Sequence, residues 1–167
     1  MRIDHAALFC SDLEQMRQFF IDYFDARSND QYHNPRTGLR TYILSFTEGS
    51  TRLELMSRPD VQDADPSQPT IGYVHLSFAV GSRKGVDLLT RRLAADGYTV
   101  TSGPRTTGDG YYESSILGPE GIQIELKHTD KSIAQISDEM NFPNPSFFNK
   151  FFKRLADQTP LEYRLSK

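Results

Sequence analysis

One histidine and one glutamate recur at matched positions in two halves of this sequence. The first half runs from Ile-Asp-His-Ala-Ala-Leu at residues 3–8 to Arg-Leu-Glu-Leu at 52–55, and the second from Tyr-Val-His-Leu-Ser-Phe at 73–78 to Gln-Ile-Glu-Leu at 123–126. About 50 positions separate the histidine from the glutamate in both halves, which indicates an internal repeat. The pairs are His5 with Glu54 and His75 with Glu125. A repeat that returns a ligand pair to the same place predicts a pseudo-symmetric metal site.

Each half has the same predicted order of strands and helices, because period-two alternation predicts strands and helical spacing of apolar residues predicts helices. In the first half, strands are predicted at residues 3–10, 41–46 and 51–56, a helix at 13–24, a loop around Asn34-Pro35 and Gly38, and a turn at 48–50. In the second half, strands are predicted at 73–80, 98–101, 111–117 and 121–126, and a helix at 84–96, after a linker at 58–70. We therefore predict an α+β fold of two βαβββ modules, residues 1–57 and 71–127. The modules are expected to pair, since neither can bury both faces of its sheet alone.

Composition excludes several classes of protein. The 167-residue chain has a net charge of −3 and a single cysteine, Cys10, so it can form neither an intrachain disulfide nor a zinc site built from several cysteines. No apolar run approaches the roughly 20 residues of a membrane span. Residues 1–5 have no apolar signal-peptide core. These features predict a cytoplasmic protein with no membrane partner.

The four repeated side chains suit a divalent metal ion. Two imidazoles and two carboxylates favour Zn, Ni, Co, Mn or Fe(II). Four protein ligands leave positions open on a six-coordinate ion, where substrate oxygens can bind. Taken singly, a histidine in a strand is more often an ordinary core or surface residue, and a glutamate between leucines more often faces solvent. The joint recurrence at matched positions favours the metal-site interpretation.

The repeated module with its ligand set, and the phrase Gly-Pro-Glu-Gly-Ile-Gln-Ile-Glu-Leu at residues 118–126, resemble the vicinal oxygen chelate superfamily. That group includes glyoxalase I, bleomycin- and fosfomycin-resistance proteins, extradiol dioxygenases and methylmalonyl-CoA epimerase. The resemblance covers residues 1–128 and is greatest to bacterial glyoxalase I (lactoylglutathione lyase). It implies a glyoxalase-like open barrel and a homodimer, with His5, Glu54, His75 and Glu125 as metal ligands within one chain or shared between two.

The same resemblance implies proton transfer beside a metal-bound carbonyl of a small α-hydroxycarbonyl substrate. The ion would act as a Lewis acid, and Glu125 or Glu54 would be the catalytic base. Glyoxalase I has an arginine shortly after its first ligand that holds a glutathione carboxylate, whereas residues 6–9 here contain no basic residue. Arg105 and a tyrosine, Tyr112, in the loop at 103–112 are candidate substrate contacts. An ordinary connection with a surface arginine is the alternative interpretation of that loop.

Residues 131–167 differ from the rest of the chain in charge. They contain six Lys/Arg and four Asp/Glu, which gives +2 within a chain of net −3. Helices are predicted at 132–140 and 143–156, and the segment resembles the C-terminal helix-turn-helix of AraC-type regulators. The resemblance implies that four side chains face a DNA groove, namely Asn144, Ser146, Asn149 and Lys150. The alternative is a helical hairpin that packs its phenylalanines on the body of the protein or on a partner subunit.

Two functions from different classes follow. The first is a metal-dependent glyoxalase-like lyase or isomerase, similar to lactoylglutathione lyase, with a structural tail. The second is a ligand-sensing transcriptional regulator, or a drug- or small-molecule-binding protein, with a tail that binds DNA. The sequence leaves the substrate and the choice of metal open.

Overall fold

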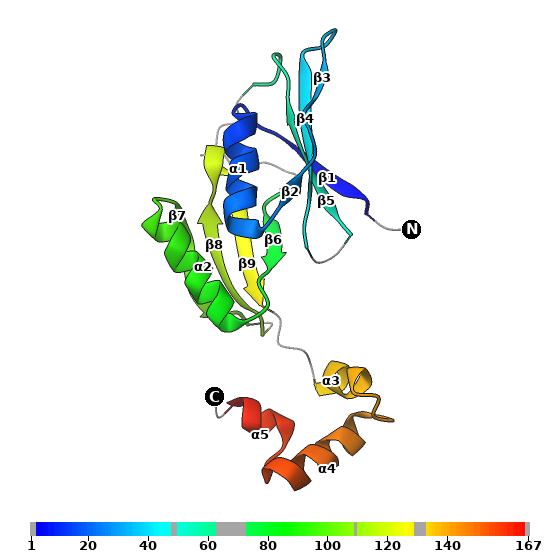
Figure 1. The fold of residues 1–167 in the computed structure, drawn as a ribbon. Coiled ribbons are helices and arrows are strands. Elements are labelled where there is room, and N and C mark those ends of the chain that lie inside the picture. Colours follow the sequence, from blue (N-terminus) through cyan, green and yellow to red (C-terminus); the bar gives the residue numbers. More distant parts are fainter. Residues whose placement is uncertain (1–2, 48–49, 63–72, 109, 129–132, 166–167) are drawn as a thin grey trace. The chain divides into compact units, whose positions relative to one another are not determined.

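A computed structural model describes residues 3–47, 50–62, 73–108, 110–128 and 133–165 (Figure 1). The chain divides into two compact units, Met1–His128 and Thr129–Lys167. Most of the predicted linker at 58–70, part of the predicted turn at 48–50 and the first residues of the predicted tail lie outside the described residues. No helix in the described part of the chain is long and apolar enough to cross a membrane.

The first module forms a mixed sheet with the strand order β1-β5-β4-β2, and β3 also pairs with β4. Its elements are β1 (His5–Phe9), α1 (Leu13–Phe24), β2 (Arg27–Ser28), β3 (Tyr32–Asn34), β4 (Leu39–Ser45) and β5 (Arg52–Ser57). Strands β1 and β5 are parallel, and the other pairs are antiparallel. Helix α1 begins after Asp12, whose carboxylate accepts a hydrogen bond from a first-turn amide, and it ends at Asp25 in the left-handed conformation.

The second module repeats this arrangement with the strand order β6-β9-β8-β7. Its elements are β6 (Leu76–Ala79), α2 (Arg83–Ala95), β7 (Thr99–Thr106), β8 (Tyr112–Leu117), the short turn η1 (Pro119–Gly121) and β9 (Gln123–His128). Strands β6 and β9 are parallel, as β1 and β5 are in the first sheet. The predicted α+β fold of two βαβββ modules with open sheets, followed by C-terminal helices, is therefore confirmed.

The structure adds strand segments that the sequence does not indicate. Strands β2 and β3 lie where a loop is predicted, because two or three residues are too few to show alternation. Strand β7 continues to Thr106, beyond the predicted end at residue 101. It contains Gly103 and Pro104, and its register against β8 shifts between Ser102 and Arg105. Glycine, proline and an irregular register hide a strand from pattern analysis.

Aromatic side chains of α1 join the two modules. The rings of Phe20 and Phe24 have centroids 5.9 and 4.3 Å from that of Phe78 in β6. The ring of Phe19 lies 5.1 Å from that of Tyr98, which precedes β7. Figure 1 shows α1 between the two sheets. The helix of the first module thereby completes the core of the second, so the two modules share one core.

A carboxylate makes a second connection between the modules. Glu120 of η1 accepts hydrogen bonds from the backbone amides of Ser11, at 2.8 Å, and Asp12, at 2.6 Å. These amides lie at the start of α1, where a negative charge is favourable because of the helix dipole. Glu120 has a φ of 54°, which is uncommon for a residue with a side chain. Glu120 makes both hydrogen bonds to the first module from this backbone conformation.

Alternation along the strands places the candidate ligands on faces that the core does not use. The leucines on either side of Glu54 are buried in the shared core, and so are the apolar residues on either side of Glu125. Successive side chains of a strand point to opposite faces, so both carboxylates lie on the face away from α1. We call these two surfaces, one on each sheet, the ligand faces.

The C-terminal unit contains three helices, α3 (Ile133–Glu139), α4 (Pro145–Ala156) and α5 (Pro160–Leu165). Asn144 caps α4 by accepting hydrogen bonds from two amides of the first turn. Asn141, between α3 and α4, has a φ of 55°, a left-handed conformation that asparagine tolerates. The ring of Phe142 lies 5.4 Å from that of Phe148 and 5.2 Å from that of Phe151. This small aromatic cluster connects the turn to α4.

Replacement of Phe20 with alanine should lower the free energy of unfolding by about 3–5 kcal/mol, because the fully buried ring would leave a cavity between the modules. Leu88→Ala on the exposed side of α2 is the matched control and should cost about 0.5 kcal/mol or less. Denaturant unfolding followed by circular dichroism measures both changes. Equal losses in the two variants would contradict the position of α1 in the shared core.

Candidate metal centre

His5 and Glu54 lie together on the ligand face of the first sheet. The Nε2 atom of His5 is 3.6 Å from a carboxylate oxygen of Glu54. Its other ring nitrogen, Nδ1, is 3.1 Å from the carboxylate of Asp4, which Arg52 also contacts. The hydrogen bond with His5 and the Arg52 guanidinium hold the pKa of Asp4 below its usual value. A carboxylate on the distal nitrogen fixes the ring of a metal-binding histidine, and here it directs Nε2 toward Glu54.

His75 and Glu125 repeat the arrangement on the ligand face of the second sheet. The Nε2 atom of His75 is 3.9 Å from the Oε2 atom of Glu125. The other oxygen, Oε1, accepts a 2.6 Å hydrogen bond from the Ser77 hydroxyl and lies 3.6 Å from the Lys127 ammonium. The carboxylate is therefore held through one oxygen, while the other oxygen faces the histidine.

The two pairs occupy the same register in their sheets. Glu54 on β5 aligns with Ala7 on β1, two residues after His5. Glu125 on β9 aligns with Ser77 on β6, two residues after His75. Residues two apart along a strand share a face, so each histidine lies diagonally across from its glutamate. The repeat in the sequence is thus a repeat of position in three dimensions.

The donor atoms within each pair fit a shared divalent ion. Ligand atoms about 2.1 Å from one ion lie roughly 3–4 Å apart, depending on the angle between the two bonds. The separations of 3.6 and 3.9 Å fall in this range and are longer than a hydrogen bond. Imidazole nitrogen and carboxylate oxygen are also donors that divalent transition metals accept. Each pair is therefore competent as half of a metal site.

The chain does not bring the two pairs together. Among the described residues, no group of three or more His, Cys, Asp or Glu side chains is placed to hold one ion. The physical reason is the shared core, since both ligand faces lie on the side of their sheet that is away from α1. The four side chains predicted as ligands therefore lie in two separate pairs, His5 with Glu54 and His75 with Glu125, which we call the half-sites.

Glu125 stays ionised although its side chain is only 11% exposed. Burial acts to raise its pKa, but the hydrogen bond from Ser77, the charge of Lys127 and further interactions with His75 and Glu113 together outweigh burial, so the pKa lies below the ordinary value of 4.5. The neighbouring Glu113 differs, because burial and repulsion from Glu125 raise its pKa. An ionised Glu125 is what a metal ligand or a general base requires.

The two predicted substrate contacts lie on different faces of the second sheet. The Arg105 guanidinium is 3.5 Å from the carboxylate of Glu113, on the ligand face. Tyr112 lies on the opposite face of β8, where its hydroxyl donates a 2.8 Å hydrogen bond to Asp87 of α2. That hydrogen bond raises the pKa of Tyr112. The structure thus brings Arg105 close to the second half-site, while a substrate contact from Tyr112 stays a prediction.

Three residues beside Glu125 were not predicted from the sequence, namely Ser77, Lys127 and Tyr111. The Tyr111 ring lies 3.7 Å from the Lys127 ammonium, which in turn contacts Glu125. Lys127 could have been found from the sequence, because it follows Glu125 by two positions on one strand. Ser77 and Tyr111 come from other segments, and their proximity depends on strand register that the sequence does not state.

The residues predicted to contact DNA lie at the N-cap and in the first half of α4. Ser146 and Lys150 are exposed, and Asn149 is half-buried. The side-chain oxygen of Asn144 is engaged with the amides of Ser146 and Phe147. Contact of these residues with DNA stays a prediction.

The family match agrees with this fold. The sequence profile of the Glyoxalase/Bleomycin resistance protein/Dioxygenase superfamily matches residues 2–126, which extend from β1 into β9. The chain therefore belongs to this superfamily, whose members commonly use divalent metals. The match ends before α3, so the three C-terminal helices lie outside it.

Relatives of the chain occur in Bacillus subtilis (strain 168). The uncharacterized protein YqjT is 28% identical over 130 residues, a match that covers 73% of this chain and 94% of YqjT. The uncharacterized protein YwkD is 31% identical over 80 residues, which covers 48% of this chain and 62% of YwkD.

Solved structures share the fold of the first unit. A glyoxalase family protein from Bacillus cereus matches with a TM-score of 0.65 and 20% identity, over 77% of this chain and 93% of that chain. The trypanothione-dependent glyoxalase I of Leishmania major matches with a TM-score of 0.63 and 18% identity, over 84% of this chain and 95% of that chain. At sequence identities this low, the structural likeness shows a common fold alone.

Ser77→Ala should raise the pKa of Glu125, because the carboxylate loses a hydrogen bond that favours its ionised form. The stabilisation from a depressed pKa is present above the ordinary value of 4.5 and is lost as pH falls through the folded-state pKa. The variant should therefore be less stable than the wild type near neutral pH, and the difference should shrink in acid. Carbon-13 NMR titration of the glutamate carboxyl groups measures the pKa.

Ser115→Ala is the control for this titration. Ser115 stands opposite Glu125 on β8 and, within the described residues, makes no hydrogen bond to it. The pKa of Glu125 should be the same in this variant as in the wild type. An equal shift in both variants would show that Ser77 does not hold the carboxylate.

Proposed function

We propose that this protein is a metal-dependent lyase or isomerase of the glyoxalase type, and that its active site forms between two copies of the chain. His5 and Glu54 of one copy and His75 and Glu125 of the other would hold one divalent ion, drawn from Zn, Ni, Co, Mn and Fe. The shared register of the two His–Glu pairs carries this proposal. A twofold-symmetric homodimer would join unlike half-sites twice and give two equivalent sites.

Exposed apolar side chains on the first ligand face support such a partner. Phe9 of β1 is 47% exposed and Tyr32 of β3 is 54% exposed. Large apolar groups left on one surface are typical of interfaces. The ligand face of the second sheet carries the charged groups Arg105 and Lys127. A small organic substrate between the two faces would meet the aromatic rings of the first face and these charged groups of the second.

The chemistry follows from the donor set and from the charge of Glu125. A divalent ion in this site would act as a Lewis acid toward the two vicinal oxygens of an α-hydroxycarbonyl substrate. Glu125 is the proposed base, because Ser77 and Lys127 keep it ionised. It would take the proton from the hydroxyl-bearing carbon and return it to the adjacent carbonyl carbon, while the hydroxyl proton passes to the former carbonyl oxygen, so that the product is an isomer of the substrate. Glu54 is the alternative base in the other half-site.

Mixing two defective variants tests the shared site. His5→Ala removes a ligand from every first half-site, and His75→Ala removes one from every second half-site. If the site lies between copies, each mixed dimer keeps one intact site. About half of the dimers formed at random are mixed, so the mixture should regain about a quarter of the wild-type metal content and turnover. Sites contained within one chain would leave no intact site, and mixing would then restore nothing.

The two variants are refolded together, and metal content is then measured by plasma mass spectrometry. Turnover is measured with the hemithioacetal formed from methylglyoxal and a thiol as the substrate. His128→Ala is the matched control, since this histidine is on the face of β9 opposite to Glu125, and it should keep the full metal content. If the wild-type protein binds the ion but converts no α-hydroxycarbonyl compound, the proposed metal site stands and the proposed reaction is wrong.

The separate C-terminal unit favours a second candidate function, a ligand-sensing regulator that binds DNA. Helices α3 and α4 are joined by a tight turn at Asn141. Ser146, Lys150 and Lys153 are exposed along α4. Exposed polar and basic side chains on the second helix of such a pair are suited to groove and phosphate contacts.

A salt-dependent gel-shift assay tests the second function. The full chain should bind duplex DNA with an affinity that falls as salt rises, and Lys150→Ala should weaken binding several-fold because one cationic contact in the groove is lost. Lys84→Ala, at an exposed position of α2 in the other unit, is the control and should change little. Absence of salt-dependent binding, or equal weakening in both variants, would eliminate this candidate.

A further inference from the structure

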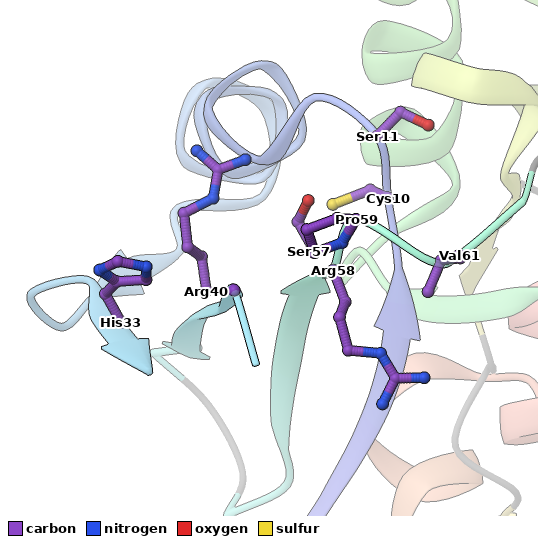
Figure 2. Close-up of a pocket in the computed structure, with 9 residues that line it drawn as sticks. Cys10, Ser11, His33, Arg40, Ser57, Arg58, Pro59 and Val61 are labelled. Atoms are coloured by element: carbon purple, nitrogen blue, oxygen red, sulfur yellow. The ribbon is translucent and has the colours of Figure 1, made fainter. Parts of the chain in front are cut away.

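A pocket of about 670 Å³ lies on the α1 side of the first sheet, near the end where α1 begins (Figure 2). This volume is within the range of small-molecule sites, about 300–1,000 Å³. Arg40 lines the pocket and shares a face of β4 with Tyr42, whose hydroxyl contacts Glu14 of α1. The pocket is therefore on the α1 side of the sheet, and the first half-site is on the opposite side. Neither the family match nor the metal chemistry assigns a role to it.

Four side chains from adjacent strands form one wall of the pocket. His33 on β3 is the register partner of Arg40 on β4, and Arg40 is the register partner of Ser57 on β5. Cys10 follows β1 and lies next, because its amide donates a 2.9 Å hydrogen bond to the carbonyl of Met56. Register partners present their side chains on the same face. An imidazole, a guanidinium, a hydroxyl and a thiol therefore lie in a row.

Among the residues that the structure describes, the Arg40 guanidinium has no acidic partner. Within the described part of the chain, neither Arg40 nor His33 makes a side-chain hydrogen bond or ion pair, and no lining residue of the pocket is acidic. Arg58, which also lines the pocket, is paired with Asp60 and lies over the Phe9 ring. Figure 2 shows Arg40 extending toward α1 and Arg58 extending away from it. Of the two arginines in the described lining, Arg40 is therefore the one available to a ligand.

The negative groups beside the pocket are already engaged. The carboxylate of Asp12 caps α1, and that of Glu120 accepts the amides of Ser11 and Asp12. Burial, together with the charges of Glu120 and Asp12, raises the pKa of the Cys10 thiol to about 12. Cys10 is therefore a neutral thiol near pH 7 and adds no negative charge that would repel an anion.

The remaining wall is apolar. Pro59 and Val61 line it, and Val61 is 39% exposed. Gly38 approaches Pro59 so closely that a Cβ at residue 38 would lie 2.9 Å from Pro59 Cγ. This contact brings the turn between β3 and β4 against the segment after β5. The pocket therefore has a cationic wall and an apolar wall.

We propose that this pocket binds a small organic anion, with its carboxylate or phosphate group on Arg40 and its apolar body against Pro59 and Val61. The fork of a guanidinium binds carboxylate or phosphate oxygens in pairs, which gives both strength and orientation. His33 and Ser57 supply further hydrogen bonds to the same group. This site does not depend on the metal or on the proposed reaction.

Titration of metal-free, full-length protein with three probes tests the proposal. Benzoate and phenyl phosphate carry the anionic group on an apolar ring, and benzyl alcohol is the neutral counterpart. The two anions should shift the amide NMR signals of residues 33, 40 and 57–61, with a Kd of about 1 mM or lower. The anion with the lower Kd shows whether the pocket prefers a carboxylate or a phosphate group. Benzyl alcohol should bind far more weakly.

Arg40→Ala should raise the Kd for the anions about 10- to 100-fold, because a charge-assisted hydrogen-bonded pair is lost. Arg40→Lys should raise the Kd less, since it keeps the charge and removes only the fork of the guanidinium. This variant tests the proposal if the alanine variant does not fold. Arg36→Ala is the matched control, an exposed arginine in the same hairpin outside the lining. No anion binding, binding that maps to the ligand faces, or equal weakening in Arg36→Ala would overturn the proposal.

Discussion

The contact of Phe20 and Phe24 with Phe78 determines which faces of the two sheets remain outside the core and available to the proposed metal site. It fixes the helix of the first module against the second sheet, so that both sheets turn their apolar side toward one core. The opposite faces, which carry Glu54 and Glu125, are then directed away from that core. A chain packed in this way holds two half-sites, and a second copy can unite them. The interaction that stabilises the fold therefore also explains why the proposed site needs a dimer.

The half-sites share their register and differ in how they are held. In the first, Asp4 fixes the histidine, and Arg52 in turn contacts Asp4. In the second, Ser77 and Lys127 fix the glutamate and keep it ionised. The first half-site thus presents an oriented imidazole, and the second presents a charged carboxylate. This difference favours Glu125 over Glu54 as the proposed base.

Sequence alone predicted those features that depend on local pattern. Alternation around Glu54 and Glu125 gave the strands and the face of each carboxylate, and the spacing of each His–Glu pair gave its partner. Features that depend on packing between distant segments were not predictable. The entry of α1 into the core of the second module separates the half-sites, and no repeat in the sequence indicates it. The row of His33, Arg40 and Ser57 likewise depends on strand register, and β3 is too short to be recognised by its pattern.

The most direct test of a site shared between two copies is anomalous X-ray scattering from crystals of the metal-loaded protein, recorded at the absorption edge of the bound ion. We expect one strong peak at each shared site, with His5 and Glu54 from one chain and His75 and Glu125 from another within bonding distance, about 2.0–2.2 Å. A peak coordinated by only one of the two pairs, or by none of these four residues, would contradict it.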